Sequence, residues 1–196
     1  MISVRWLFTV IAILCVGCGT NRINAGFPEV PPPPTARPDA PKIGIARVAD
    51  SRADRSGGWF NSNVNVIVGP ELNDYIERKF RVELVEHGFA PLEALNPAST
   101  ANPSNCKTIV VTLQSADIGG SGVFLPSAAA SADIAVQVYA PASRVVIFAQ
   151  SYYGKDSERI SSFKELGMNS GRIIAVATDQ AIDNAFADPA FEKALK

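Results

Sequence analysis

The C-terminal half of the chain contains two neighbouring stretches whose apolar residues recur at every second position. Residues 132–140 alternate large apolar side chains with small or polar ones, and residues 144–153 follow after a turn at Pro141-Ala142-Ser143. A period of two places one set of side chains on one face of a β-strand. The two stretches predict a β-hairpin, and residues 108–116 predict a third strand of the same kind. A sheet with one apolar face has to be covered, so the rest of the domain must supply a second layer.

Two predicted helices supply that layer. Residues 71–87 carry an apolar row at four-residue spacing and end before Gly88. Residues 170–186 begin at Ser170, a residue suited to the N-cap, and carry a second, Ala-rich stripe. We therefore predict an α+β domain, a two-layer sandwich of a mostly antiparallel sheet with two amphipathic helices on one face. The stripe residues are Leu72, Ile76, Phe80 and Leu84 in the first helix and Ile174, Ala177, Ala181 and Ala185 in the second.

Shorter elements complete the predicted domain. Residues 43–50 and 64–68 have the apolar pattern of short strands, and Asp188-Pro189 ends the last helix before one more helical turn. Stretches rich in Gly, Pro, Asn and Ser between these elements predict loops. The predicted loops and polar connections are residues 51–63, 90–105, 118–127 and 154–167.

The N-terminus has the layout of a secretory signal. A positive charge near the start is followed by a nearly continuous apolar run from Trp6 to Leu14. The run is too short for a transmembrane helix, which needs about 20 residues. Gly17 is small enough to precede a processed residue, whereas Leu14, before Cys15, is not. Cys18 is therefore predicted to be the lipidated first residue of a mature bacterial lipoprotein, and the alternative is an ordinary cleaved signal in which Cys18 is a passenger.

Lipidation of Cys18 has consequences for localisation and domain organisation. Diacylglycerol and a further acyl chain such as palmitate hold a protein firmly to a membrane. Gly19 stands where an Asp would favour the inner membrane, so we expect the outer membrane, with the domain facing the periplasm. The Pro-rich segment predicts a stiff spacer. The predicted organisation is a signal peptide at residues 1–17, a lipidated cysteine with a Pro-rich tether at 18–41, and a single domain at 42–196.

Charge and residue counts argue against several function classes. The chain has 18 Lys and Arg against 19 Asp and Glu, so it has no basic excess for nucleic acid. The single histidine, His87, stands at a helix end, where a donor meets exposed carbonyls. Cys106 is the only cysteine after Cys18; we interpret it as a buried thiol, with a reactive or intermolecularly paired thiol as the alternative. We expect no metal site, no cofactor and no nucleic-acid partner.

Four apolar residues in predicted loops are candidates for an interaction surface. Trp59 and Phe60 lie in the loop 51–63, and Phe124 and Leu125 lie in the loop 118–127. If they are exposed, they mark contact with a partner protein or a membrane. If they are buried, they cap the sandwich.

A charged cluster around the end of the first strand is the only candidate for catalysis. Asp50 and Asp54 could act as acid and base or bind a hard cation. Arg52 and Arg55 balance these charges, so a salt-bridged surface loop is the better interpretation.

Several short motifs, in order along residues 43–195, resemble the YajG family of bacterial lipoproteins. The resemblance implies a lipid-anchored envelope domain and supplies no catalytic residues. The Gly-rich stretch at 119–122 and the long N-terminal segment have no match in that family. The matching motifs are Asp50-Ser51-Arg52, Val64 to Val68, His87-Gly88-Phe89, Ala132 to Val136, Tyr152-Tyr153-Gly154 and Asp179 to Ile182.

The sequence as a whole predicts a non-enzymatic lipoprotein that is anchored in the bacterial envelope. It would act by contact with an unknown envelope protein, as an accessory to transport or assembly. One alternative is a small-ligand binder whose pocket opens between sheet and helices. The other is a hydrolase that uses the Asp50/Asp54 loop.

Overall fold

The protein is a two-layer α+β structure, and the predicted fold class is confirmed. The computed structural model describes residues 21–53, 56–60, 64–98, 104–121, 127–159 and 163–196. Within these residues a mixed nine-stranded sheet carries three helices. None of these helices is long and apolar enough to span a membrane. The elements are β1 Asn21–Asn24, β2 Lys42–Ala46, β3 Ala49–Asp50, β4 Ser56–Phe60, β5 Val64–Ile67, α2 Glu71–Glu86, β6 Ala90–Ala94, β7 Thr108–Ser121, β8 Ser127–Tyr139, β9 Val146–Arg159, α3 Phe163–Phe186 and α4 Pro189–Leu195.

Strand β7 organises the sheet. On one side it pairs with β8, which pairs with β9, and these long ladders are antiparallel as predicted. Along its other edge β7 pairs in turn with three short strands that run parallel to it, β2, β3 and β4. Strand β6 extends the sheet beyond β2, and β5 and β1 extend it beyond β4. The sheet is therefore widest at its two ends.

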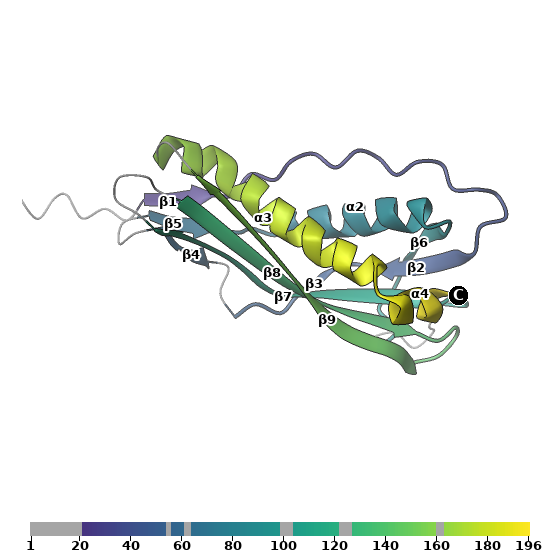
Figure 1. The fold of residues 1–196 in the computed structure, drawn as a ribbon. Coiled ribbons are helices and arrows are strands. Elements are labelled where there is room, and N and C mark those ends of the chain that lie inside the picture. Colours follow the sequence, from purple (N-terminus) through teal and green to yellow (C-terminus); the bar gives the residue numbers. More distant parts are fainter. Residues whose placement is uncertain (1–20, 54–55, 61–63, 99–103, 122–126, 160–162) are drawn as a thin grey trace, which may run out of the picture.

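Helices α2 and α3 lie on the same face of this sheet, as predicted (Figure 1). The predicted stripe of α2 is fully buried. Helix α3 lies over β8 and β9, and Gly154 of β9 lets it approach closely, because a Cβ there would collide with the carbonyl oxygen of Ala177. Apolar residues from both layers form one continuous core between sheet and helices.

Several segments that the sequence predicts to be loops are strands. The loop 51–63 contains β4, and the loop 90–105 contains β6. Both are short and poor in β-branched residues, so hydrogen bonds to neighbouring strands stabilise them more than their own propensity does. Strands β7 and β9 run further than predicted, through part of 118–127 and 154–167. Helix α3 begins seven residues earlier than predicted, and Ser170 is a buried interior residue rather than its N-cap.

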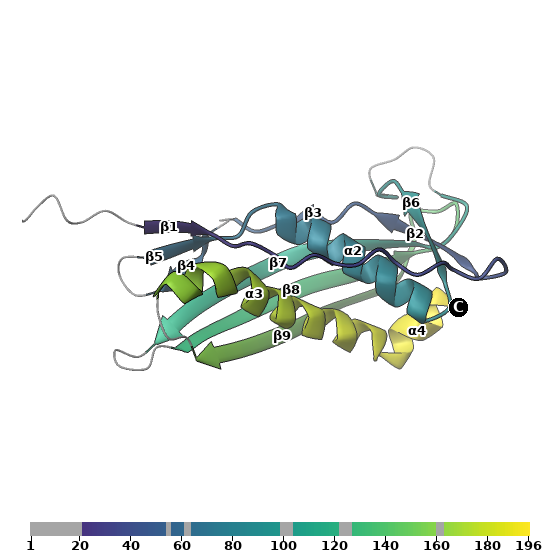
Figure 2. The same cartoon turned by 90° about the horizontal axis from the view of Figure 1, so that it is seen from above.

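The Pro-rich N-terminal segment is part of the domain, which differs from the predicted tether. Strand β1 pairs with β5, and the Ala25 amide donates to the Ile67 carbonyl (2.9 Å). From there residues 25–41 run along the helix layer to β2 (Figure 2). Ala25 and Val30 are buried in the core, and the Phe27 ring lies 6.1 Å from the Tyr75 ring. A run of prolines lacks the backbone N–H groups that helix interiors and central strands need, but it can lie extended along an apolar surface. Composition alone therefore suggested a spacer.

Candidate functional site

One end of the sheet gathers the ends of six strands. In the ladder pairs, Phe60 lies opposite Gly120, Ser121 opposite Ser127, and Ser127 opposite Arg159. The predicted loops 51–63 and 118–127 therefore meet at one end of the molecule, although 60 residues separate their paired positions in the sequence. We call this the β1 end, because β1 begins there as well.

Two of the four predicted interaction residues, Trp59 and Phe60, lie at the β1 end. The backbones of Trp59 and Phe60 pair with Asn65 and Val64 in the β4–β5 ladder, so both residues belong to a strand and not to a loop. Phe124 and Leu125 lie outside the described residues, between the paired Ser121 and Ser127. Cys18 also lies outside them, and the described chain begins three residues later at Asn21 with β1. Whether the four apolar side chains contact a partner stays a prediction.

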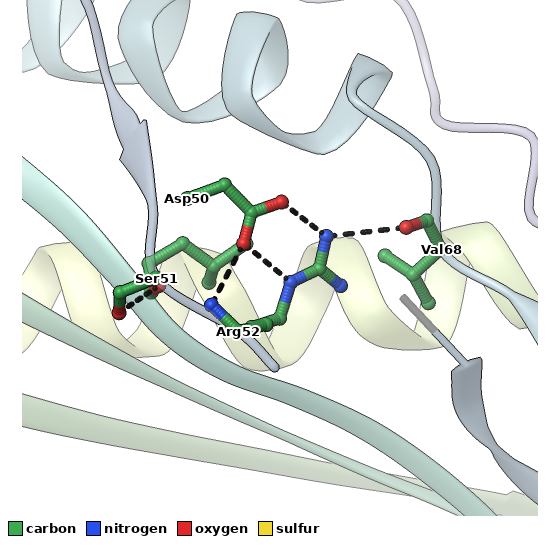
Figure 3. Close-up of polar contacts among 5 residues, drawn as sticks. Asp50, Ser51, Arg52 and Val68 are labelled. Carbon is green, nitrogen blue, oxygen red and sulfur yellow. Dashed lines mark hydrogen bonds and ion pairs between the residues drawn. The ribbon is translucent and has the colours of Figure 1, made fainter. Parts of the chain in front are cut away.

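The charged cluster is built around a buried ion pair at the end of β3 (Figure 3). The Arg52 guanidinium donates to both oxygens of Asp50, from Nε to Oδ1 at 2.9 Å and from Nη2 to Oδ2 at 2.8 Å. The two side chains are only 3% and 11% exposed. Arg52 Nη2 also donates to the Val68 carbonyl (3.1 Å), and Ser51 Oγ donates to the Leu113 carbonyl (3.0 Å). The Asp50-Ser51-Arg52 motif thus ties the chain between β3 and β4 to β7 and to the entry of α2.

This geometry gives the Asp50 carboxylate a structural partner. A bidentate Arg–carboxylate pair engages both carboxylate oxygens, which suits a structural role better than acid–base catalysis. Asp54 lies outside the described residues. Within the described part of the chain, no group of three or more His, Cys, Asp and Glu residues could hold a metal ion.

A polar contact between α2 and α3 was not singled out from the sequence. Tyr75 donates to Asp179 Oδ1 at 2.8 Å, and Lys79 Nζ lies 3.6 Å from Asp179 Oδ2. Burial raises the pKa of Asp179, while the Tyr75 hydroxyl and the Lys79 ammonium act in the opposite direction. Burial also raises the pKa of Tyr75, and so does the neighbouring carboxylate. The only signal in the sequence is the hydroxyl-bearing Tyr75 beside a stripe that is otherwise apolar.

The face of the sheet away from the helices carries a shallow hollow of about 500 Å³. Its floor consists of small residues in register across β7 and β8, with Gly119 opposite Ala129 and Asp117 opposite Ser131. Tyr153 and Lys155 on β9 line it as well. Nearby on this face, Asp133 Oδ1 is buried and has no hydrogen-bond partner among the described residues. We call this surface the outer face.

The single histidine and Cys106 each contact a neighbouring side chain of the fold. The His87 ring follows α2 and lies 5.0 Å from the Phe186 ring, in a tilted contact. Cys106 is a half-buried free thiol whose Sγ lies 3.0 Å from Ser104 Oγ. Cys106 lies just before β7, which begins at Thr108, and is therefore close to the predicted strand start.

Comparison with known proteins finds similarity in structure only. No protein-family model and no curated protein sequence matches the chain. A DUF330 protein from Xanthomonas campestris is 13% identical with a TM-score of 0.46, covering 89% of this chain and 92% of its own. A minor lipoprotein from Acinetobacter baumannii is 8% identical with a TM-score of 0.46, covering 78% and 92%. Lipoprotein GNA1162 from Neisseria meningitidis is 12% identical with a TM-score of 0.35, covering 68% and 95%. The resemblance to the YajG family stays a prediction.

Proposed function

We propose that this protein is a lipid-anchored lipoprotein of the bacterial cell envelope that acts through protein–protein contact, as an accessory to envelope transport or assembly. The observation that carries the proposal is Cys18, placed after a short apolar run and a small residue. The acyl chains, palmitate among them, would hold the protein at the outer membrane, with the domain in the periplasm.

Acylation of Cys18 is tested by expressing the chain in a Gram-negative host and measuring the mass of its N-terminal peptide. We expect the mass of Cys18 with its lipid, in the outer-membrane fraction. Cys18→Ser should abolish acylation, whereas Cys15→Ser, the matched control, should leave it intact. A mature N-terminus other than Cys18, or an unmodified Cys18, would overturn the anchor.

The outer face is the surface that we propose for protein contact. Helices α2 and α3 cover the other face, whereas Ile147 and Tyr153 on β9 are 45% and 55% exposed. Strand β9 pairs only with β8 within the described part of the chain, and α3 side chains cap part of its second edge. Asn184 Nδ2 donates to the Tyr153 carbonyl (3.0 Å), and the Lys155 amide donates to Gln180 Oε1 (2.9 Å). The exposed apolar and aromatic side chains of this face suit a protein partner.

Photocrosslinking in intact cells tests this surface. A photoreactive amino acid at Tyr153 should give one discrete adduct with an envelope protein. The same amino acid at the exposed Arg78 of α2 serves as the control and should give none. Equal recovery of abundant bystanders at both positions would contradict the proposal.

The two alternatives make separate predictions. A hydrolase that depends on the Asp50/Asp54 loop should lose activity in Asp54→Asn with the fold intact, because Asp50 is engaged by Arg52. A small-ligand binder has little room between sheet and helices, where apolar side chains form a continuous core. Its ligand would have to use the hollow on the outer face.

A further inference from the structure

The distance along the chain between Cys18 and the folded domain is very short. Strand β1 begins at Asn21, only three residues after Cys18. An extended chain spans at most about 3.6 Å per residue, so Asn21 can lie no more than about 11 Å from Cys18. The polar headgroup layer of one leaflet is itself roughly 5–7 Å thick.

Strand β1 is held in place by several independent contacts. It pairs with β5 over Asn21 to Asn24, and the following Ala25 is buried in the core. Gly26 packs against Gly171 of α3 so closely that a Cβ on Gly171 would collide with the Gly26 carbonyl. Releasing β1 to lengthen the tether would therefore break ladder hydrogen bonds and expose buried apolar surface.

From these contacts we infer that the β1 end of the sheet faces the lipid bilayer and touches it. The inference rests on the proposed acylation of Cys18. The Pro-rich segment then does not hold the domain away from the membrane; it leads away from the bilayer along the helix layer. In Figure 1 the start of α3 lies at this same end, whereas α4 lies at the opposite end.

The residues at the β1 end suit a lipid surface. Trp59 and Phe60 are the last residues of β4, at this end of the sheet. Aromatic residues, and Trp above all, favour the interface between headgroups and acyl chains. Trp59 becomes the only tryptophan of the mature chain once the signal containing Trp6 is removed.

Trp59 is therefore a natural probe for the experiment. The acylated protein, purified from membranes, is placed in phosphatidylcholine vesicles whose acyl chains carry bromine near the headgroup. If Trp59 lies at the interface, its emission should fall by roughly half or more relative to unbrominated vesicles. An insert of about 15 Gly and Ser residues after Thr20 adds a flexible linker of roughly 20 Å and should largely restore the emission.

A pair of labelled variants gives a second measurement that does not depend on how Trp59 is packed. Spin labels on Arg159→Cys and Lys193→Cys, each in a Cys106→Ser background, report on the β1 end and on α4, and both positions are exposed. A nickel-chelating lipid should relax the label at 159 strongly and the label at 193 weakly. Equal relaxation at both positions, together with unquenched Trp59, would overturn the orientation.

The two proposals fail in different ways. An unmodified Cys18 in the mass measurement removes both the anchor and the orientation. An acylated Cys18 with no quenching of Trp59 and no preference for position 159 removes the orientation and leaves the anchor.

Discussion

The two faces of the β7–β8–β9 sheet are built from alternate residues of the same strands, yet they differ sharply. On β8, Ile134, Val136 and Val138 point to the helices and are fully buried. The residues that alternate with this buried set along the strand, such as Ser131 and Ala135, belong to the outer face and are partly exposed. Hydrophobic alternation alone divides the strand into these two sets.

This difference separates positions where a substitution should destabilise the fold from positions where it should not. The inner face is shaped by contact with α3 and α4, and even a single added methyl group has no room at Gly154. The outer face has small residues and a hollow instead. Matched substitutions on the two faces test this difference.

Truncation in the buried core should have the largest effect. Ile134→Ala removes a fully buried side chain, so we expect the free energy of unfolding to fall by about 2–5 kcal/mol. Ser131→Ala, on the outer face of the same strand, should change it by less than about 0.5 kcal/mol. Urea denaturation of both variants measures this. A large loss in Ser131→Ala would mean that the outer face is more tightly packed than its exposure indicates.

Adding one methyl group should separate the two faces as well. Gly154→Ala pushes α3 away from β9 and should cost about 1–3 kcal/mol. Gly119→Ala meets no atom within 4 Å, so it should be neutral or slightly stabilising. Thermal unfolding followed by circular dichroism compares the two. Equal tolerance would contradict the close approach of α3 to β9.

Two neighbouring tyrosines on β9 offer a smaller test. Tyr152 faces inward, and its hydroxyl donates to Asp188 Oδ2 at 2.7 Å, at the N-cap of α4. Tyr152→Phe should therefore lower the free energy of unfolding by about 0.5–1.5 kcal/mol. Tyr153→Phe, on the outer face, should have almost no effect. Urea titration distinguishes them, and equal losses would show that the outer tyrosine also has a structural bond.

The smallest effect concerns pH and the contact between α2 and α3. Burial raises the pKa of Asp179, so the folded chain keeps this proton to higher pH than the unfolded chain does. Its contribution to stability is therefore greatest below the ordinary pKa of Asp and is lost as pH rises through the raised value. In Asp179→Asn the side chain cannot titrate and still accepts from Tyr75.

Urea titrations across the acidic range measure this contribution. The stability of the wild type relative to Asp179→Asn should fall as the pH is raised from about 3.5 to 7. Asp117→Asn on the outer face is a control for the loss of one negative charge. A constant difference between wild type and Asp179→Asn would contradict the predicted direction.

Sequence reasoning reached the fold class, the hairpin and the helix α2, because each has a strong local pattern. It also predicted that arginines balance the acids of the charged cluster, and Arg52 does pair with Asp50. The predicted surface loop was wrong for this pair, which is buried, and Asp54 and Arg55 lie outside the described residues. It did not reach β4 and β6, whose pairing depends on partners far along the chain. The contact between Tyr75 and Asp179 spans 104 residues, and no local pattern signals it.

The buried residues of β8 and α2 can be predicted from the sequence alone, because hydrophobic periodicity acts over a few neighbouring residues. The sequence also supplied the case for Cys18, which depends on a short local signal. The structure was needed to show that the Pro-rich segment belongs to the domain. An extended segment without internal hydrogen bonds is positioned by the residues that it packs against, and these lie far away in the sequence. Strand pairing between residues far apart in the chain has no local signal either, so only the structure showed that Phe60 and Gly120 lie side by side at the β1 end.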